Sequence, residues 1–324
     1  MRTITNSISL LLPALLVALS AGHAVAVTYT TLDHPLATNS TIATGISGNN
    51  VVGFYQDYDA TSNPDHWLHG FLYDGSSYTT LNAPLAALGT GTIAWGISGS
   101  NIVGWYEGHN SAGNSGEYGF IYNGSTYSTL QHPLGVRGTR AFGISGSNIV
   151  GNYYDSSFTG HGFLYNGSSY TTIDDPLGVG GTFPYGISGN DIVGFYYDSS
   201  GHQHGFLYDG SSYTTLDFPG AIDTTAAGIF GNNIIGHYSE FNGDRGHNYL
   251  FNGSTYTILE DPFGMQPSNT FGIDGNNIVG FYNDSSSIQH GFLAQVPEPS
   301  SILLFSIGAI GLGAVARRRR RTRN

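Results

Sequence analysis

A thirteen-residue segment, HGFLYDGSSYTTL, occupies residues 69–81 and returns unchanged at residues 204–216. A near copy, HGFLYNGSSYTTI, occupies residues 161–173. The dipeptide Gly-Ile also recurs, 42 to 51 residues apart, at Gly45, Gly96, Gly143, Gly186, Gly228 and Gly272. A period of this length is typical of propellers and solenoids, in which each repeat forms one supersecondary unit. The chain is therefore expected to stack copies of one small unit.

Each repeat contains four segments with the composition of β-strands. The first ends at Gly-Ile, and the other three are IVGFYY (192–197), HGFLY (204–208) and SYTTL (212–216) in one complete copy. Asp-Gly or Asn-Gly after the third segment supplies the positive φ that short hairpin turns need. The second and third segments are apolar on both faces, so each small sheet must be covered on both sides. These features favour the blades of a β-propeller.

The two ends of the repeat region contain complementary parts of a blade. The region begins with YTTLDHP at residues 29–35, a fourth strand without a third, and finishes with HGFLA at residues 290–294, a third strand without a fourth. Joining them completes a sixth blade and removes the unpaired edges of an open array. We therefore predict an all-β, six-bladed β-propeller of four-stranded blades, closed by the N- and C-terminal strands, in residues 27–295. A sandwich or a solenoid is the alternative.

A glycine stands in the middle of the second strand of every repeat. Its six occurrences are Gly53, Gly104, Gly151, Gly194, Gly236 and Gly280. Glycine weakens a strand, and it often marks a place where another backbone approaches closely. We therefore expect neighbouring blades to approach one another closely at these six positions.

The HGF-type block of the third strand resembles the HAF-type extracellular repeats of bacterial exported proteins, with glycine in place of the central alanine. That resemblance implies no defined activity. The block begins with histidine at His69, His161, His204 and His290, whereas the other two repeats have Tyr118 and Asn248. Equivalent residues on separate blades lie too far apart to share one metal ion unless they line the narrow centre of the ring, and a metal site at the axis is the alternative. Each histidine is expected to make a hydrogen bond that holds a turn of its own blade.

The N-terminus has the layout of a secretory signal peptide, predicted to span residues 1–26. One basic residue, Arg2, precedes an apolar stretch at residues 8–21 and the small-residue pattern Ala24-Val25-Ala26. This order predicts export and cleavage after Ala26. A short membrane anchor is the alternative.

The C-terminus, residues 296–324, resembles the PEP-CTERM sorting signal of Gram-negative bacteria. Its parts are the motif Pro297, Glu298 and Pro299, an apolar run at 302–316, and the cluster Arg317, Arg318, Arg319, Arg320 and Arg321. The apolar run is expected to form a single transmembrane helix with a cytoplasmic C-terminus, by the positive-inside rule. The resemblance implies processing by exosortase, transient membrane anchoring, a final place in the cell envelope or outside the cell, and a link to biofilm and exopolysaccharide. A plain tail anchor is the alternative.

The region between these two signals is strongly acidic. Residues 27–296 contain 21 acidic residues, three arginines and no lysine, which gives a formal charge of −18. A body of this charge repels phosphate backbones, so nucleic-acid binding is disfavoured. The chain has no cysteine, so packing and ring closure rather than disulfides must stabilise it.

Candidate ligand-binding residues are those that break the repeat. The sequence contains no cysteine nucleophile, no G-x-S-x-G motif and no H-E-x-x-H motif. The large or charged exceptions chosen as ligand-binding candidates are Trp67, Trp95, Trp105, Arg137 and Arg140. Aromatic faces stack on sugars, and arginines receive anionic groups. Ordinary packing and solvated loops are the alternative for these residues. Glu107 and Arg245 also break the repeat.

We predict no cofactor and no catalytic residue. Aspartates recur after the second strand at Asp57, Asp155, Asp198 and Asp284, where they are expected to be turn residues, with calcium ligation as the alternative. The predicted function is that of an exported, non-enzymatic surface or matrix protein, a binding or scaffold module for exopolysaccharide or surface proteins. The alternative is a glycosidase or lyase, which would need an acidic pair in one deep axial pocket.

Overall fold

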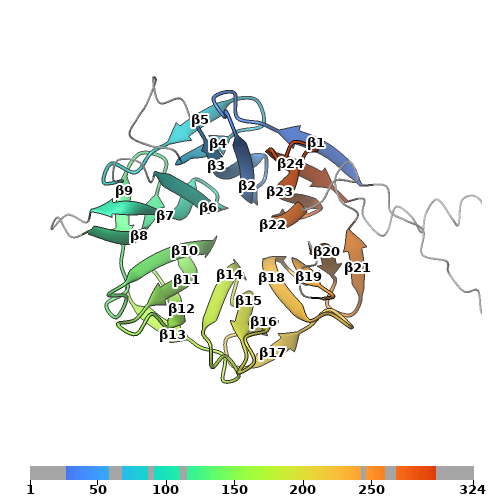
Figure 1. Ribbon diagram of the computed structural model, residues 1–324. Coiled ribbons are helices and arrows are strands. Elements are labelled where there is room, and N and C mark those ends of the chain that lie inside the picture. The colour runs from blue at the N-terminus through green and yellow to red at the C-terminus, as the bar shows by residue number, and fades with distance from the viewer. Residues whose placement is uncertain are drawn as a thin grey trace, which may run out of the picture.

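The computed structural model describes residues 27–57, 68–86, 91–109, 115–241, 246–259 and 268–296. Within these residues the chain forms 24 β-strands, arranged as small radial sheets around a central axis (Figure 1). No helix long and apolar enough to cross a membrane occurs in this part of the chain. The predicted signal peptide and the predicted C-terminal helix lie outside the described residues.

Five sheets, here called blades I to V, each consist of four antiparallel strands that are consecutive in sequence. Blade I comprises β2 (Ser40–Ser47), β3 (Asn50–Gln56), β4 (Leu68–Tyr73) and β5 (Tyr78–Leu81). Blade II comprises β6 (Thr92–Ser98), β7 (Asn101–His109), β8 (Ser115–Tyr122) and β9 (Tyr127–Leu130). Blade III comprises β10 (Gly138–Ser145), β11 (Asn148–Tyr154), β12 (Gly160–Tyr165) and β13 (Tyr170–Ile173).

Blades IV and V repeat this order. Blade IV comprises β14 (Thr182–Ser188), β15 (Asp191–Tyr197), β16 (Gln203–Tyr208) and β17 (Tyr213–Leu216). Blade V comprises β18 (Asp223–Phe230), β19 (Asn233–Ser239), β20 (His247–Phe251) and β21 (Tyr256–Leu259). The first strand of each blade lies innermost and the fourth lies at the periphery (Figure 1).

Blade VI is assembled from both ends of the described chain. It comprises β22 (Ser268–Asp274), β23 (Asn277–Asn283), β24 (Gln289–Gln295) and the N-terminal β1 (Thr28–Leu32). Strand β1 pairs antiparallel with β24, from Thr28 opposite Gln295 to Leu32 opposite Gly291. The predicted closure by the two terminal strands is confirmed. One further bridge, between Ser40 and Gln289, links blade VI to blade I.

The hydrophobic core lies between neighbouring blades rather than in one central mass. One cluster joins Val103 and Leu130 of blade II to Ile149 and Phe163 of blade III, and similar clusters occur at other interfaces. The third-strand aromatic residue is fully buried, as Phe163 shows. Each sheet is thus covered on both faces, which explains why the second and third strands do not alternate between polar and apolar residues.

Two sets of glycines meet different neighbours. A Cβ at Gly45 would lie 2.5 Å from the carbonyl oxygen of Trp95 in blade II, so the Gly-Ile glycines mark the close approach between blades. A Cβ at mid-strand Gly104 would instead overlap the carbonyl oxygen of Ile93 and lie 2.9 Å from the Phe120 ring, both within blade II. The prediction that the mid-strand glycines mark contacts between blades is therefore wrong. They make room inside each blade for the first strand and the third-strand aromatic ring.

The two faces of the ring carry different connections between strands. The face with the turns between first and second strands is here called the hairpin face, and the opposite one the loop face. On the hairpin face, the amide N–H of Gly99 donates to Ser47 Oγ of the preceding blade at 3.2 Å, and the same bond recurs at Gly146, Gly189 and Gly231. Strand β1 begins and β24 ends at this face, where the Val296 amide donates to the carbonyl of Asn276.

Candidate functional site

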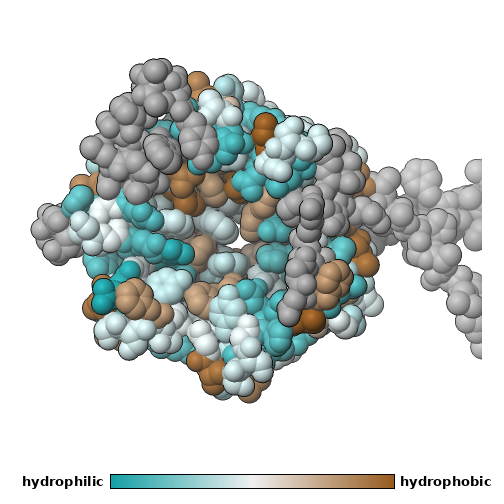
Figure 2. Space-filling view, in the orientation of Figure 1, coloured by the Kyte–Doolittle hydropathy of each residue, from teal (hydrophilic) through white to brown (hydrophobic). Residues whose placement is uncertain are grey.

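An extended hairpin breaks the ring's regularity on the loop face. Strands β7 and β8 contain nine and eight residues, against seven and six for β11 and β12 of blade III. The extra pairs, Gly108 opposite Gly116 and His109 opposite Ser115, project past the end of the sheet. Between this hairpin and the loops of blade III lies a cavity of about 590 Å³. Figure 2 shows hydrophilic residues gathered over β7, β8 and β10 in this region.

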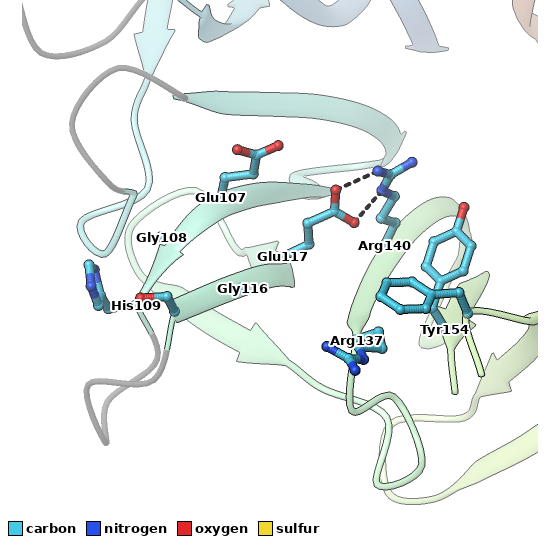
Figure 3. Close-up of a pocket in the computed structure, with 10 residues that line it drawn as sticks. Glu107, Gly108, His109, Gly116, Glu117, Arg137, Arg140 and Tyr154 are labelled. Carbon is cyan, nitrogen blue, oxygen red and sulfur yellow. Dashed lines mark hydrogen bonds and ion pairs between the residues drawn. The ribbon is translucent and has the colours of Figure 1, made fainter. Parts of the chain in front are cut away.

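The cavity is lined by residues of blades II and III. They are Glu107, Gly108, His109, Ser115, Gly116, Glu117, Arg137, Arg140, Tyr154 and Phe158 (Figure 3). The lining combines two arginines, two carboxylates, a histidine and two aromatic rings. Such a mixture of ring faces, donors and acceptors suits a polar ligand with an apolar face.

An ion pair crosses the interface at the inner end of the cavity. Arg140 of β10 donates from Nε to Glu117 Oε2 at 2.7 Å and from Nη2 to Glu117 Oε1 at 2.5 Å. Its guanidinium also lies over the Trp105 ring, 4.7 Å from the centroid. Burial alone would lower the pKa of Arg140, but the hydrogen bond and charge of Glu117 outweigh burial and raise it. Arg140 therefore stays charged, and the two hydrogen bonds fix the orientation of both side chains.

The repeat shows where this pair comes from. Strand register aligns Glu117 with Gly160 and Gln203, and Arg140 with Phe183 and Thr225. Between blades III and IV, a Cβ at Gly160 would lie 2.5 Å from the Phe183 ring. Between blades IV and V, Thr225 Oγ1 donates to Gln203 Oε1 at 2.9 Å. The fold thus places these two positions against each other, and only the side chains change between these three interfaces.

Arg137 lies at the outer end of the cavity, in the loop between β9 and β10. Its side chain is exposed, and its guanidinium carbon lies 4.5 Å from the centroid of the Phe158 ring. Among the described residues it makes no ion pair. Its backbone N–H donates to the carbonyl of Tyr154 at 3.1 Å, which fixes the loop against β11.

The predicted candidates divide into three groups. Arg137 and Arg140 line this one cavity, whereas Trp105 is not a lining residue and packs against the Arg140 guanidinium. The buried Trp105 Nε1 has no hydrogen-bond partner among the described residues. Trp95 lies elsewhere, on the ring axis, 5.1 Å from the Phe142 ring. Trp67 lies outside the described residues, as does Arg245.

The axis itself is nearly filled. Trp95 packs across it against the rings of Tyr185 and Phe271, and the remaining axial space is about 80 Å³. The described residues that line this space include no carboxylate. Burial raises the pKa of Tyr185 to about 12, so its hydroxyl stays protonated. The axis therefore offers no acidic pair among the described residues.

The repeated histidines make hydrogen bonds within their own blades, as predicted. His161 Nδ1 lies 2.8 Å from Asp174 Oδ2, and the imidazole stacks on Tyr153. Equivalent pairs are His204 with Asp217 and His290 with Asp33. Burial alone would lower the pKa of His204, but the hydrogen bonds and charges of Asp217 and Asp198 outweigh burial, and the net effect is a raised pKa.

One alignment in blade V needs correction. His247 lies opposite Tyr238, as His161 lies opposite Tyr153, so His247 rather than Asn248 is the repeat's histidine. Asn248 instead occupies the position of Gly162, the glycine that follows the histidine in blade III. It donates to Ser268 Oγ at 2.7 Å and so ties blade V to blade VI.

The repeated aspartates form turns. Asp155 Oδ1 accepts the amide N–H groups of Ser157 and Thr159 at 2.8 and 2.9 Å, and Asp198 and Asp284 do the same. No group of three His, Cys, Asp or Glu side chains able to hold a metal ion occurs in the described part of the chain. The calcium alternative, at Asp57 and its equivalents, stays a prediction.

Comparison with known proteins bears on the C-terminus and on the fold. A sequence profile of the PEP-CTERM protein-sorting motif matches residues 295–321. That match implies processing by exosortase-type machinery and export to the cell envelope or surface of a Gram-negative bacterium. No curated protein sequence matches the chain. The resemblance to HAF-type repeats stays a prediction.

Similar solved structures include six-bladed lectins. A fucose-recognising lectin from Aleuria aurantia with a six-bladed β-propeller fold has a TM-score of 0.50 and 18% identity, over 80% of this chain and 92% of the lectin. A mutant of that lectin, in complex with Fucα1-6GlcNAc, has a TM-score of 0.52 and 15% identity, over 81% and 96%. SapL1 lectin, in complex with α-methyl fucoside, has a TM-score of 0.52 and 13% identity, over 82% and 98%. At these identities the likeness concerns the fold alone.

Proposed function

We propose that this protein is an exported, non-enzymatic surface or matrix protein that binds a saccharide in the cavity between blades II and III. The sorting motif supports the surface location. The lectins of similar fold, which were solved with fucosides, support a saccharide as the class of ligand. Association with exopolysaccharide, and through it with biofilm, belongs to the same proposal.

Phe158 carries the proposal. This residue adopts a φ of 64°, and its side chain is 66% exposed at the cavity. The same turn position is Gly201 in blade IV, with a φ of 82°, and Ser287 in blade VI, with a φ of 65°. An L-residue in this conformation costs about 1 kcal/mol or more, and an exposed ring recovers little of it by burial. The turn imposes this conformation in all three blades, and of the three only blade III places a large exposed ring there, at the edge of the cavity.

The other lining groups complement an aromatic platform. Tyr154 and Phe158 offer ring faces for the C–H surface of a pyranose. Glu107, Glu117 and Arg140 offer acceptors and donors for hydroxyl groups. Because Arg140 and Glu117 already hold each other, a sugar would meet a preorganised pair rather than two mobile chains.

A glycan array followed by calorimetry tests this proposal. The array would contain fucosides, neutral bacterial exopolysaccharides and uronate oligomers, and the protein would be the full-length chain in mild detergent. Phe158→Gly copies the turn of blade IV, so it should keep the fold and weaken binding of any array ligand about tenfold or more, equal to ~1.4 kcal/mol. Ser287→Gly, the matched change in blade VI, should leave affinity unchanged. Equal affinity of both variants and the native protein would refute this site.

A glycosidase or lyase is the second candidate, and one observation favours it. Glu107 lies directly opposite Glu117 across β7 and β8, so two carboxylates line one cavity. Incubating the native protein with each bound glycan and measuring new reducing ends distinguishes the two functions. Turnover that Glu107→Gln abolishes would establish the enzyme, and binding without turnover would support the lectin-like function.

A further inference from the structure

The arginines of this acidic protein are not spread over its surface. Residues 27–296 carry 21 carboxylates and three arginines, and two of the three, Arg137 and Arg140, line the same cavity. A cation at the surface of so negative a body is normally neutralised by a neighbouring carboxylate. Whether each arginine is neutralised therefore indicates which one is available to a ligand.

The two arginines differ in this respect. Arg140 is bound by Glu117 through two hydrogen bonds, and the two side chains point toward each other (Figure 3). Arg137 lies apart from that pair in the same view and makes no ion pair among the described residues. Its guanidinium carbon lies over the Phe158 ring, 4.5 Å from the centroid, and no carboxylate of the described residues forms an ion pair with it. Of the remaining titratable groups of the lining, Glu107 and His109 lie on the hairpin of blade II and Tyr154 lies at the end of β11.

The loop that carries Arg137 does not need an arginine. In blade III the amide N–H groups of Val136 and Arg137 donate to Leu134 and Tyr154. In blade IV the same bonds run from Val179 and Gly180 to Leu177 and Tyr197, with glycine in place of the arginine. Because the two loops have the same backbone bonds, the guanidinium contributes something other than loop structure.

We propose that Arg137 binds the carboxylate of an acidic saccharide, so that the ligand of this cavity carries uronate or a similar acidic group. This inference rests on the proposed saccharide site and adds that the saccharide is negatively charged. The planar guanidinium matches the two oxygens of a carboxylate, and its contact with the Phe158 ring places it at the cavity. The net negative charge of residues 27–296 disfavours the binding of acidic polymers elsewhere on the protein. Arg137 would therefore also determine where an acidic polymer binds.

A matched pair of ligands tests the charge without changing the sugar. Calorimetry would compare an oligogalacturonate with its methyl ester on the native full-length protein and on Arg137→Gly, which copies the blade IV loop. We expect the native protein to bind the acid about tenfold more tightly than the ester, a difference of ~1.4 kcal/mol. Arg137→Gly should remove that difference, so that the variant binds the acid and the ester with equal affinity. The native preference should also shrink as salt rises.

Each other outcome counts against the inference. Equal affinity of the native protein for acid and ester would overturn it, while leaving the saccharide site in place. An acid preference that survives in Arg137→Gly would overturn the role of Arg137. Binding of neither oligomer, with a neutral hit on the glycan array, would overturn the acidic ligand alone, whereas no hit on the array would remove the saccharide site as well. Thermal unfolding of both proteins at the same temperature would show that the variant is folded.

Discussion

Replacing the mid-strand glycine of blade IV with alanine tests how closely the strands of a blade are packed. A Cβ at Gly194 would overlap the carbonyl oxygen of Phe183 and lie 2.8 Å from Pro184 Cα, both backbone atoms of the neighbouring strand β14. Backbone atoms in a paired strand cannot rotate away, so β14 and β15 must separate. Overpacking of this kind costs about 1–3 kcal/mol, and the smaller entropy of the unfolded alanine chain offsets only ~0.4–1 kcal/mol.

We therefore expect Gly194→Ala to lower the free energy of unfolding by about 2 kcal/mol, which is a fall in Tm of roughly 4–8 °C for a domain of this size. The assay is thermal unfolding followed by circular dichroism at one fixed scan rate. Gly116→Ala is the control, because its nearest neighbour would be Tyr118 Oη at an ordinary 3.5 Å. If Gly194→Ala melts with the control and the native protein, then the reasoning about strand spacing within a blade is incorrect.

Three further changes test other parts of the ring. Glu117→Gly should lower the free energy of unfolding by about 1–3 kcal/mol, because it leaves Arg140 partly buried and unpaired. The double variant Glu117→Gly, Arg140→Phe copies the glycine and phenylalanine between blades III and IV, so it should recover stability in urea unfolding. Burial lowers the pKa of His34 to about 4 in the folded protein, so as the pH falls His34 is protonated in the unfolded chain before it is protonated in the folded one. Stability should therefore fall as pH drops from about 6.5 to 4, and His34→Asp, which copies Asp175 of the equivalent turn between blades III and IV, should flatten that part of the Tm profile. Leu32→Ala, in the strand that closes the ring, should cost ~2–5 kcal/mol in the same urea assay, and an unchanged midpoint would contradict the role of β1 in closure.

The repeat made the fold predictable. A regular spacing of Gly-Ile pairs, together with a lone fourth strand at one end and a lone third strand at the other, leaves few ways to pair every strand. The mid-strand glycines were misread because periodicity shows that a position is crowded but does not show by what. The crowding atoms, such as the carbonyl of Ile93, belong to the same blade.

The candidate site was only partly predictable. Trp105, Arg137 and Arg140 stood out because they are large or charged where the repeat is not. The structure places both arginines at one cavity and Trp105 against Arg140. Trp95 satisfied the same criterion but fills the axis. Glu117 was missed although the sequence aligns it with Gly160, because the sequence does not show that this position faces Arg140 of the next blade.

Phe158 was missed for a different reason. Its significance lies in a positive φ and an exposed ring, and neither can be read from a turn that otherwise matches its repeats. One signal was available in the sequence. The Asp-Ser-Ser turn is followed by glycine in blade IV and by serine in blade VI, so the aromatic Phe158 differs from the small residues at the equivalent positions.

The positions of the two chain ends give the ring a direction. Strand β1 begins and β24 ends on the hairpin face, and the sorting segment follows directly from β24, whereas the cavity opens on the loop face. In the proposed membrane-held state, the segment that leads to the membrane would leave the ring on one face, and the proposed saccharide cavity would open on the other. The thickness of the ring would then separate the two, so the cavity would face away from the membrane. Cleavage of the C-terminal segment would release the ring without altering the cavity.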